Sequence, residues 1–196
     1  MAFETVKTNL EARGYTVKVF ATGAEAAAYL DSEIDGKSVG IGGSMTIQSM
    51  GLYEKLSAHN EVHWHWVSGP EAHAQAAVAQ VYLTSANGLT EKGEILNIDG
   101  AGNRVASTLF GHQKVYFVIG KNKLAPTFEE ALWRARNIAA PKNAQRLGKK
   151  TPCAVNGDRC YDCSSPERIC RGLTVNWGPM MGKEAEVILV EEELGL

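Results

Sequence analysis

The sequence has 196 residues, which is enough for one domain with a substantial core but hardly for two. Its formal net charge is −2 with pI ≈ 6.2, and no long block of like charges occurs, which argues against a nucleic acid or an acidic membrane surface as the partner. Residues 1–14 interleave charged with apolar side chains, unlike a signal peptide, and no apolar run approaches the ~18 residues of a membrane span. We therefore expect a cytoplasmic protein whose partner is a small molecule.

The first half alternates short β-branched runs with amphipathic stretches, a pattern typical of parallel strands joined by crossover helices. The fold class that it predicts is α/β. Phe3, Val6 and Leu10 recur at helical spacing, and Gly14 can end that helix in the left-handed conformation that glycine tolerates. Strands are expected over 15–20, 38–41, 62–67, 81–84, 94–98 and 115–119, and further helices over 22–30, 47–56 and 70–79.

Histidine and tryptophan alternate along the expected strand 62–67. His63 and His65 would therefore share one face of the strand, opposite Trp64 and Trp66. Two imidazoles on one face could bind a metal ion, but we prefer the interpretation of a half-buried edge strand.

Two capping boxes are predicted, Thr22 with Glu25 and Thr127 with Glu130. In each box the two side chains satisfy free amides at the start of a helix. The second helix is expected to end at Pro141, because proline lacks the amide that a helix interior needs.

The composition changes beyond that helix. Residues 142–182 are rich in Lys, Arg, Gly, Pro and Cys and show little periodicity. We therefore expect an irregular segment that needs an additional cross-link to stay ordered. Residues 187–190 are expected to form a last strand, at an edge of the sheet.

The loop Gly42-Gly43-Ser44-Met45-Thr46 joins an expected strand to an expected helix. Its glycines allow a sharp turn, and its hydroxyls lie beside the free amides of the helix start, which favours binding of a phosphate or a carboxylate. An ordinary turn would need only one glycine, and spacing alone does not decide between the two interpretations. The candidate binding residues here are Gly42, Gly43, Ser44 and Thr46.

Polar residues crowd around the expected strands 81–84 and 94–98. In open α/β sheets, ligand crevices form outside the carboxyl ends of the strands, which favours a binding site here. The alternative is that Lys92-Gly93 and Asp99-Gly100 form ordinary turns without a ligand. The binding candidates are Ser85, Asn87, Asn103, Arg104 and, after the strand 115–119, Lys123, and the acid–base candidates are Asp99 and Glu94.

Several short strings in the middle of the chain are specific enough to suggest a relationship. They are Thr84-Ser85-Ala86-Asn87, Gly93-Glu94-Ile95, Asn97-Ile98-Asp99-Gly100, Gly102-Asn103-Arg104-Val105-Ala106, Gly120-Lys121-Asn122-Lys123 and Ala139-Ala140-Pro141. Together they closely resemble the LUD (lactate utilisation) domain family. The resemblance covers most of the chain, from the Gly42-Gly43-Ser44 loop to Glu193-Leu194-Gly195.

The resemblance implies a single LUD domain over 1–196, in a short stand-alone form similar to lactate utilisation protein C. It also implies a Rossmann-like parallel sheet with flanking helices, similar to the sugar-phosphate isomerase and CoA-transferase group. A glycine-rich loop with Ser or Thr commonly meets phosphate in that group. The family includes a component of an operon that oxidises lactate to pyruvate beside iron–sulfur subunits. We therefore expect a role in lactate or hydroxy-acid utilisation or a related metabolic step.

The four cysteines of the chain, Cys153, Cys160, Cys163 and Cys170, crowd into one short segment. Cytoplasmic thiols stay reduced, so metal ligation is a better interpretation than a disulfide framework. Free thiols at this density would invite oxidation. The spacing suits either a zinc ion or a cubane cluster. We favour a [4Fe–4S] cluster over zinc because of the family's association with electron-transfer operons.

Two functional hypotheses remain open. The first is an enzyme or enzyme subunit that acts on a small anionic metabolite. In it Ser44 and Thr46 bind the anion, Arg104 and Lys123 neutralise it, and Asp99 or Glu94 supplies acid–base chemistry. The second is a non-catalytic electron-transfer or metal-stapled ligand-binding subunit of a larger oxidoreductase, since the chain shows neither a complete nucleophile triad nor a dinucleotide fingerprint. Other oxidoreductase subunits or a second copy of the chain are the possible protein partners.

Overall fold

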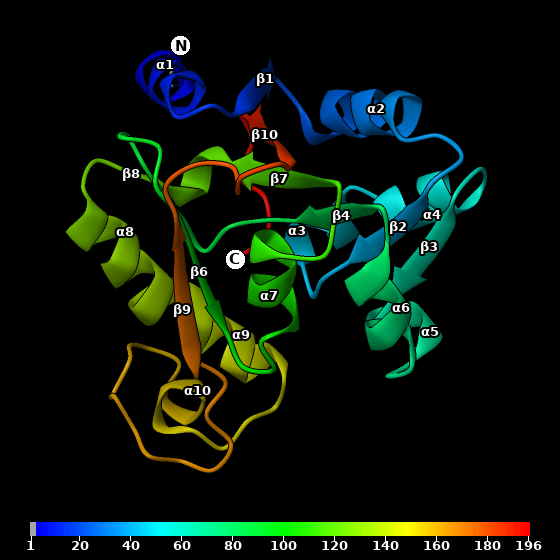
Figure 1. The fold of residues 1–196 in the computed structure, drawn as a ribbon. Coiled ribbons are helices and arrows are strands. Elements are labelled where there is room, and N and C mark those ends of the chain that lie inside the picture. The colour runs from blue at the N-terminus through cyan, green and yellow to red at the C-terminus, as the bar shows by residue number, and fades with distance from the viewer. Residues whose placement is uncertain (1–2) are drawn as a thin grey trace.

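The computed structural model describes residues 3–196 (Figure 1). Met1 and Ala2 lie outside the described residues. They are the first two residues of the segment 1–14, which we expected not to be a signal peptide. Within 3–196, no helix combines the length and the apolar character that a membrane crossing requires.

A six-stranded sheet forms the centre of the fold, and all its neighbouring strands are parallel. The α/β fold class expected from the sequence is thereby confirmed. In spatial order the strands are β1 (Thr16–Phe20), β10 (Glu184–Val190), β7 (Lys114–Gly120), β4 (Val81–Thr84), β2 (Ser38–Ile41) and β3 (Glu61–Trp64).

Both faces of this sheet are buried, because alternate residues of its strands enter two different apolar clusters. In β7, Tyr116 and Val118 belong to one cluster, whereas Phe117 and Ile119 belong to the other. The first cluster is covered by α2 (Gly23–Glu33), α3 (Met45–Ser49) and α4 (Leu52–Ser57), and the second by α1 (Glu4–Ala12). The helices α5 (His65–Ser68) and α6 (Ala72–Val78) contact β3, and α7 (Asn103–Leu109) contacts β4.

A second, smaller lobe carries a four-stranded mixed sheet (Figure 1). Its strands, in spatial order, are β8 (Leu124–Ala125), β5 (Gly88–Thr90), β6 (Ile95–Asp99) and β9 (Gly172–Asn176). A 3₁₀ turn, Lys121–Lys123, leads from β7 into β8. The lobe also contains α8 (Phe128–Arg134), a π-helix (Ala135–Ala139), α9 (Ala140–Arg146) and α10 (Pro152–Asn156).

Several expected elements are confirmed at or near their predicted bounds. Strands 38–41 and 81–84 match β2 and β4. Both capping boxes are present, because Thr22 accepts from the backbone N–H of Glu25 and Thr127 from that of Glu130, with the reciprocal bonds also made. Local capping chemistry was therefore enough to place these two helix starts.

The expected edge position of the last strand is wrong. β10 lies between β1 and β7 and pairs with both in parallel. Residues 187–190 are fully buried. An uninterrupted apolar run of this kind is typical of a strand that is covered on both faces. The apolar run therefore indicates a central strand, although the strand comes late in the sequence.

The expected helix end at Pro141 is also wrong. The helix passes from α8 through the π-helix Ala135–Ala139 into α9, which continues to Arg146. Proline is tolerated because it lies in the first turn of α9, directly after the π-helix has changed the hydrogen-bond register. The segment 142–182 is therefore less irregular than expected, since it also contains α10 and β9.

Two further elements differ from expectation. The strand expected over 62–67 ends at Trp64, and α5 begins at His65, so His63 and His65 do not share a strand face. The helix expected over 47–56 is divided into α3 and α4 by Gly51, whose φ of 62° requires the left-handed region. The first change is the important one, because it turns His65 towards the site described next.

Candidate functional site

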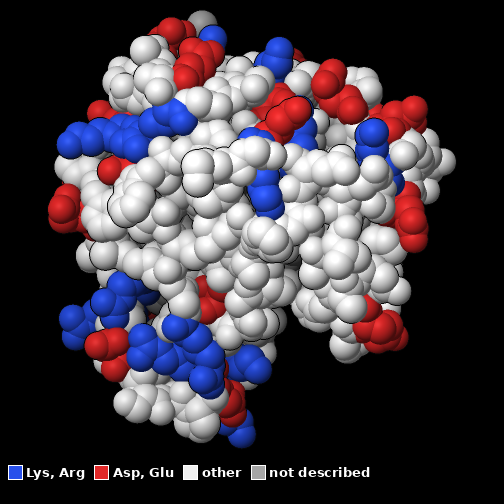
Figure 2. All heavy atoms as spheres, in the orientation of Figure 1, with Lys and Arg blue, Asp and Glu red and all other residues white. Residues whose placement is uncertain are grey.

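A cavity of about 480 Å³ lies at the carboxyl edge of the parallel sheet, between the two lobes. Residues from the ends of β2 and β4, from β6 and from the 3₁₀ turn after β7 line one side of it. The opposite side comes from α9 and from residues 166–169. Figure 2 shows an indentation of the surface between the lobe that carries α9 and α10 and the part that carries α5 and α6. Crevices at this edge are the usual ligand sites of open α/β sheets.

The cavity brings together most of the candidate residues. Gly42 lies just behind the wall, where an added Cβ would meet the hydroxyl of Tyr82 and the side chain of Arg104. Glu94 is at the opposite end of β6, where its carboxylate accepts from the Thr90 hydroxyl at 2.6 Å, so it does not reach the cavity. The candidates that line the cavity are Gly43, Ser44, Thr46, Ser85, Asn87, Asp99, Asn103, Arg104 and Lys123.

Lys123 lies at the floor of the cavity and is only 3% exposed. Its Nζ donates to Thr46 Oγ1 and to Ser85 Oγ, each at 3.0 Å, and the two hydroxyl oxygens are 3.2 Å apart. Burial, together with the smaller effects of the positive charges of Arg134 and Arg104, lowers the pKa of Lys123 to about 7. Near neutral pH, a large share of the amine is therefore uncharged.

Arg104 is held almost entirely by neutral acceptors. Its guanidinium donates to the carbonyl of Ile98 at 2.6 Å and to the side-chain oxygens of Asn97 and Asn87 at 3.0 and 3.3 Å. The carboxylate of Asp99 is 3.9 Å from Nε. Burial lowers the pKa of Arg104, but arginine remains charged.

Arg134 is a third buried cation next to this site. It is 8% exposed and donates to the backbone carbonyls of Asn122 and Asn87, each at 2.6 Å. Within residues 3–196, no carboxylate forms an ion pair with Lys123 or with Arg134. Carbonyl dipoles and hydroxyls carry less compensating charge than a carboxylate, so the floor of the cavity is electropositive.

Two candidate residues have clear structural tasks. The Asp99 carboxylate accepts from the backbone N–H groups of Ala101, Arg104 and Val105 at 3.2, 3.0 and 3.2 Å, and so caps the start of α7. The Ser44 hydroxyl accepts from the N–H of Ile47 at 3.3 Å and caps α3. Both side chains line the cavity, but these bonds occupy part of their hydrogen-bonding capacity.

Among the lining side chains that the sequence alone missed are His65, Trp66 and Arg146. The Arg146 guanidinium lies 4.6 Å from the centre of the Trp66 ring, so that a cation–π contact links α9 to α5 across the cavity. His65 stacks on His73 at 4.1 Å, and burial, with the neighbouring His73, lowers the pKa of His65. These residues were missed because the strand was extended through residue 67 and the helix was ended at Pro141.

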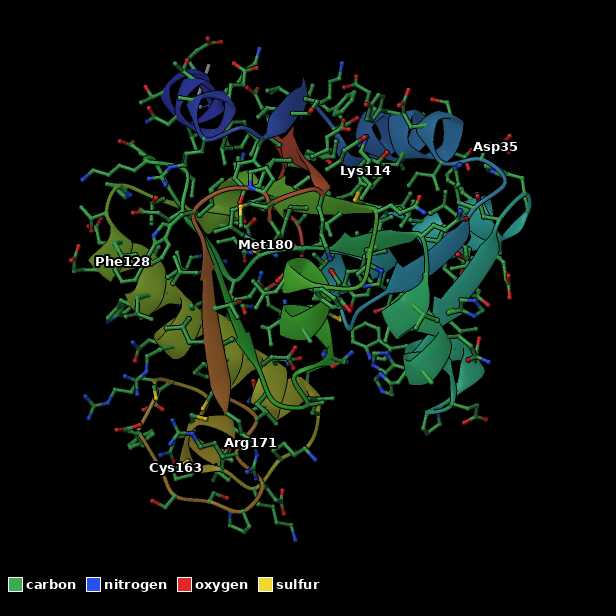
Figure 3. All side chains as sticks on the ribbon, viewed as in Figure 1. Asp35, Lys114, Phe128, Cys163, Arg171 and Met180 are labelled. Carbon is green, nitrogen blue, oxygen red and sulfur yellow. The ribbon has the colours of Figure 1, made fainter. Side chains whose placement is uncertain are left out.

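The four cysteines line a second, smaller pocket together. Figure 3 places Cys163 and Arg171 on the loop that surrounds α10. Cys160 Sγ accepts from the backbone N–H of Asp162 at 3.3 Å and from the Arg136 guanidinium at 3.6 Å. In the described part of the chain, no three His, Cys, Asp or Glu side chains are grouped closely enough to hold one metal ion.

The two pockets share a wall. Ala140, Arg168 and Ile169 line both of them. The Arg168 guanidinium donates to the carbonyls of Cys170 and Cys163 at 2.9 and 2.8 Å, so it stabilises the conformation of the cysteine loop beside this shared wall. A ligand in the cavity and an occupant of the thiol pocket would therefore be neighbours.

The fold and this edge define a parallel α/β protein with a cationic cavity where its strands end. A comparison with protein families matches the LUD domain over residues 3–190. The chain belongs to the LUD domain family, and the resemblance stated from the sequence is confirmed.

Two similar proteins illustrate this membership. The chain is 28% identical to a protein of Escherichia coli (strain K12) named YkgG over 138 residues, which cover 69% of this chain and 57% of that protein. The match thus spans little more than half of the relative's length. A crystal structure of a DUF162 family protein from Deinococcus radiodurans shares a TM-score of 0.59 at 15% identity, with 96% of each chain covered. At this identity the likeness shows the fold alone.

Proposed function

We propose that the cavity binds a small anionic metabolite, such as a hydroxy acid, an oxo acid or a phosphate ester. The observation that carries this proposal is the set of cations Lys123 and Arg134, which are buried, and Arg104, whose side chain is 12% exposed. Among the described residues, only the carboxylate of Asp99 forms an ion pair with any of them, at 3.9 Å from Arg104 Nε. Buried charge without a matching partner is costly, and an anionic ligand would remove that cost. A role in hydroxy-acid utilisation, as an enzyme or as an enzyme subunit, agrees with this ligand class.

The chemistry of the site follows from its residues. Arg146 and Lys149 line the upper part of the cavity and would attract the anion, whereas Thr46 and Ser85 offer hydroxyls at its floor. Asp99 remains the acid–base candidate at the carboxyl end of β6. An anion bound next to Lys123 would favour its ammonium form and so raise its pKa, because opposite charges stabilise each other.

Isothermal titration calorimetry with lactate, pyruvate and glycerol 3-phosphate tests this proposal. We expect binding of at least one of these anions and a loss of roughly tenfold in affinity in the variant Arg146→Ala/Lys149→Ala, as removal of charged contacts predicts. Lys142→Ala is the matched control, because Lys142 lies on α9 but does not line the cavity. Absence of binding by every anion, or equal losses in the two variants, would contradict the proposal.

We propose as a second function that the thiol pocket holds an iron–sulfur cluster. All four cysteines line one pocket, yet in residues 3–196 no group of side chains is arranged for one ion. A cubane would bind each of the four thiolates to a separate iron. Arg136 and the Asp162 amide would supply the hydrogen bonds to sulfur that tune a cluster.

Metal and sulfide analysis of protein purified without oxygen tests this second proposal. We expect iron and acid-labile sulfide, with a visible absorbance that is lost on chelation. Cys163→Ser should lose most of the iron, whereas the neighbouring Ser164→Ala should retain it. A colourless protein with bound zinc, or with four free thiols, would contradict the cluster.

A further inference from the structure

The amine at the floor of the cavity is the most unusual chemical group in the described structure. Lys123 is 3% exposed, and its Nζ contacts two hydroxyls, those of Thr46 and Ser85, in place of a carboxylate. Lysine is almost never buried without a charged partner unless its environment favours the neutral form. Binding an anion would need only a cation, and an exposed lysine would provide that without the cost of burial.

Two structural features favour the uncharged form of this amine. It lies in a nearly water-free position, and its nearest strong charges are the cations Arg134 and Arg104. Desolvation and a neighbouring cation are the two means by which proteins turn a lysine into a nucleophile. Since Lys123 also lines the cavity, its lone pair is available to a small molecule bound there.

From this geometry we infer that Lys123 is a nucleophile that forms a Schiff base with the carbonyl group of an anionic metabolite. The inference rests on the proposed anion site and deepens it by naming the ligand class, a carbonyl compound that carries a carboxylate or a phosphate. Such a ligand fits because its anionic group can offset the positive charge of an iminium that forms next to Arg134 and Arg104.

The reaction balances with groups that are present. The lone pair of Lys123 Nζ forms a bond to the carbonyl carbon as the C=O π bond opens, and the oxygen takes up a proton to give a carbinolamine. The C–O bond then breaks and water leaves, with C=N in its place, and no oxidant or reductant is consumed. Thr46 and Ser85, 3.0 Å from Nζ and 3.2 Å from each other, can pass the protons between nitrogen and oxygen.

Ser85 is the alternative nucleophile, with Lys123 as its base. As a base, Lys123 would take up a proton on Nζ, next to the cations Arg134 and Arg104. The ligand would not be bonded to Nζ, so its negative charge would not be held beside that proton. This role would also require an acyl substrate and aligned donors for an oxyanion. The groups around Nζ are hydroxyls, which can transfer protons. Schiff-base formation needs such a transfer both when the carbinolamine forms and when it loses water.

Borohydride trapping tests the inference directly. The purified protein is incubated with pyruvate or with dihydroxyacetone phosphate, sodium borohydride is added, and the peptides are mapped by mass spectrometry. We expect a reduced adduct on the peptide that contains Lys123, because borohydride converts the C=N bond to a stable secondary amine. A signal with pyruvate alone identifies an oxo acid as the ligand class, and one with the triose phosphate alone identifies a sugar phosphate.

Matched variants separate this chemistry from simple binding. Lys123→Arg keeps a positive charge but lacks the nucleophilic amine, so its adduct should fall by roughly tenfold or more. Lys121→Arg, in the same 3₁₀ turn but exposed, should leave the adduct unchanged. Ser85→Ala should slow trapping, because one of the two hydroxyl contacts of Nζ is lost.

Calorimetry on the same samples distinguishes the failure of this inference from failure of the proposed function. Binding of either carbonyl compound without any adduct on Lys123 would overturn the inference and leave the anion site intact. An adduct spread equally over exposed lysines would also overturn it. Neither binding nor adduct would overturn both. Peptide mapping of the unaltered protein decides these cases even if a variant fails to fold.

Discussion

Lys123 carries a cost in stability that depends on pH. Its pKa is lowered from 10.5 to about 7 in the folded protein, whereas the unfolded chain retains the ordinary value. Between these two values the unfolded state binds more protons, so the free energy of unfolding rises with pH. The cost of burying the ammonium is therefore complete below about pH 7 and disappears as the pH approaches 10.5.

Replacement of this amine by an apolar side chain should stabilise the protein at low pH. Lys123→Met is expected to raise the free energy of unfolding most below pH 7, and the gain should shrink through the window up to pH 10.5. The change over that window is on the order of 5 kcal/mol, because each unit of pKa shift corresponds to about 1.4 kcal/mol. Urea unfolding of both proteins across this pH range measures it.

The exposed neighbour Lys121 provides the control for this experiment. Lys121→Met should change the free energy of unfolding little and by the same amount at each pH. A gain in Lys123→Met that stayed constant from neutral to alkaline pH would show that Lys123 is charged in the folded protein.

At the scale of single residues, the sequence identified much of the polar side of the cavity lining, from the end of β2 to the turn after β7. Ser85 and Arg104 were predicted from polar residues around strand ends, and Ser44 from the glycine-rich loop before a helix. Ser44 and Ser85 follow β2 and β4 at one edge of the parallel sheet, whereas Arg104 follows β6 of the smaller sheet. Glu94 was misplaced, because it precedes β6 while the cavity lies at the end of that strand. The burial of Lys123 could not be predicted, since it depends on packing between segments far apart in the chain.

At the scale of elements, close approach between α6 and β2 depends on Gly40. An added Cβ at this position would overlap with the backbone carbonyl oxygen of Ala76 and lie against the ring of Tyr82. Backbone atoms cannot rotate away as a flexible side chain can, so the helix would have to move away from the sheet.

Gly40→Ala should therefore lower the free energy of unfolding by about 3 kcal/mol, at the upper end of the usual cost of overpacking. Gly172→Ala is the matched control, because Gly172 also lies in a strand but nothing would meet its Cβ within 4 Å. Urea unfolding measures both variants. An equal loss in the two variants would show that β-strand geometry, and not contact with α6, determines the cost.

The elements were predicted best where local chemistry decides them. Capping boxes and β-branched runs gave α2, α8, β2 and β4. Prediction failed where tertiary structure overrides a local pattern, as in the π-helix that carries the chain past Pro141. That π-helix also supplies Arg136, which contacts Cys160.

At the scale of the whole molecule, Arg168 lines both pockets and bonds within the cysteine loop. Its bonds to the carbonyls of Cys163 and Cys170 are among the contacts that fix this loop. In Arg168→Ala we expect faster amide hydrogen exchange over residues 158–172, with little change in the six-stranded sheet, because loops with few buried contacts open locally. Arg159→Ala, which removes only an exposed stacking contact with Tyr161, is the control.

Hydrogen-exchange mass spectrometry measures the effect of Arg168→Ala by segment. Since Arg168 and Ile169 line both pockets, the variant should also weaken binding of any anion that the cavity accepts. Exchange that rose equally in β7 and β10 would show global destabilisation and would contradict a local role for Arg168.

The central position of β10 determines when the protein can fold during synthesis. Residues 16–20 and 114–120 do not pair with each other, since residues 184–190 lie between them. In a nascent chain that has emerged from the ribosome only as far as the cysteine segment, β1 is therefore not joined to the four strands β7, β4, β2 and β3, and both β1 and β7 have an unpaired edge. The last strand must insert between β1 and β7. Pairing between strands that are so far apart in the sequence is slow. Until then the exposed edges are where chaperones, or other nascent chains, would bind.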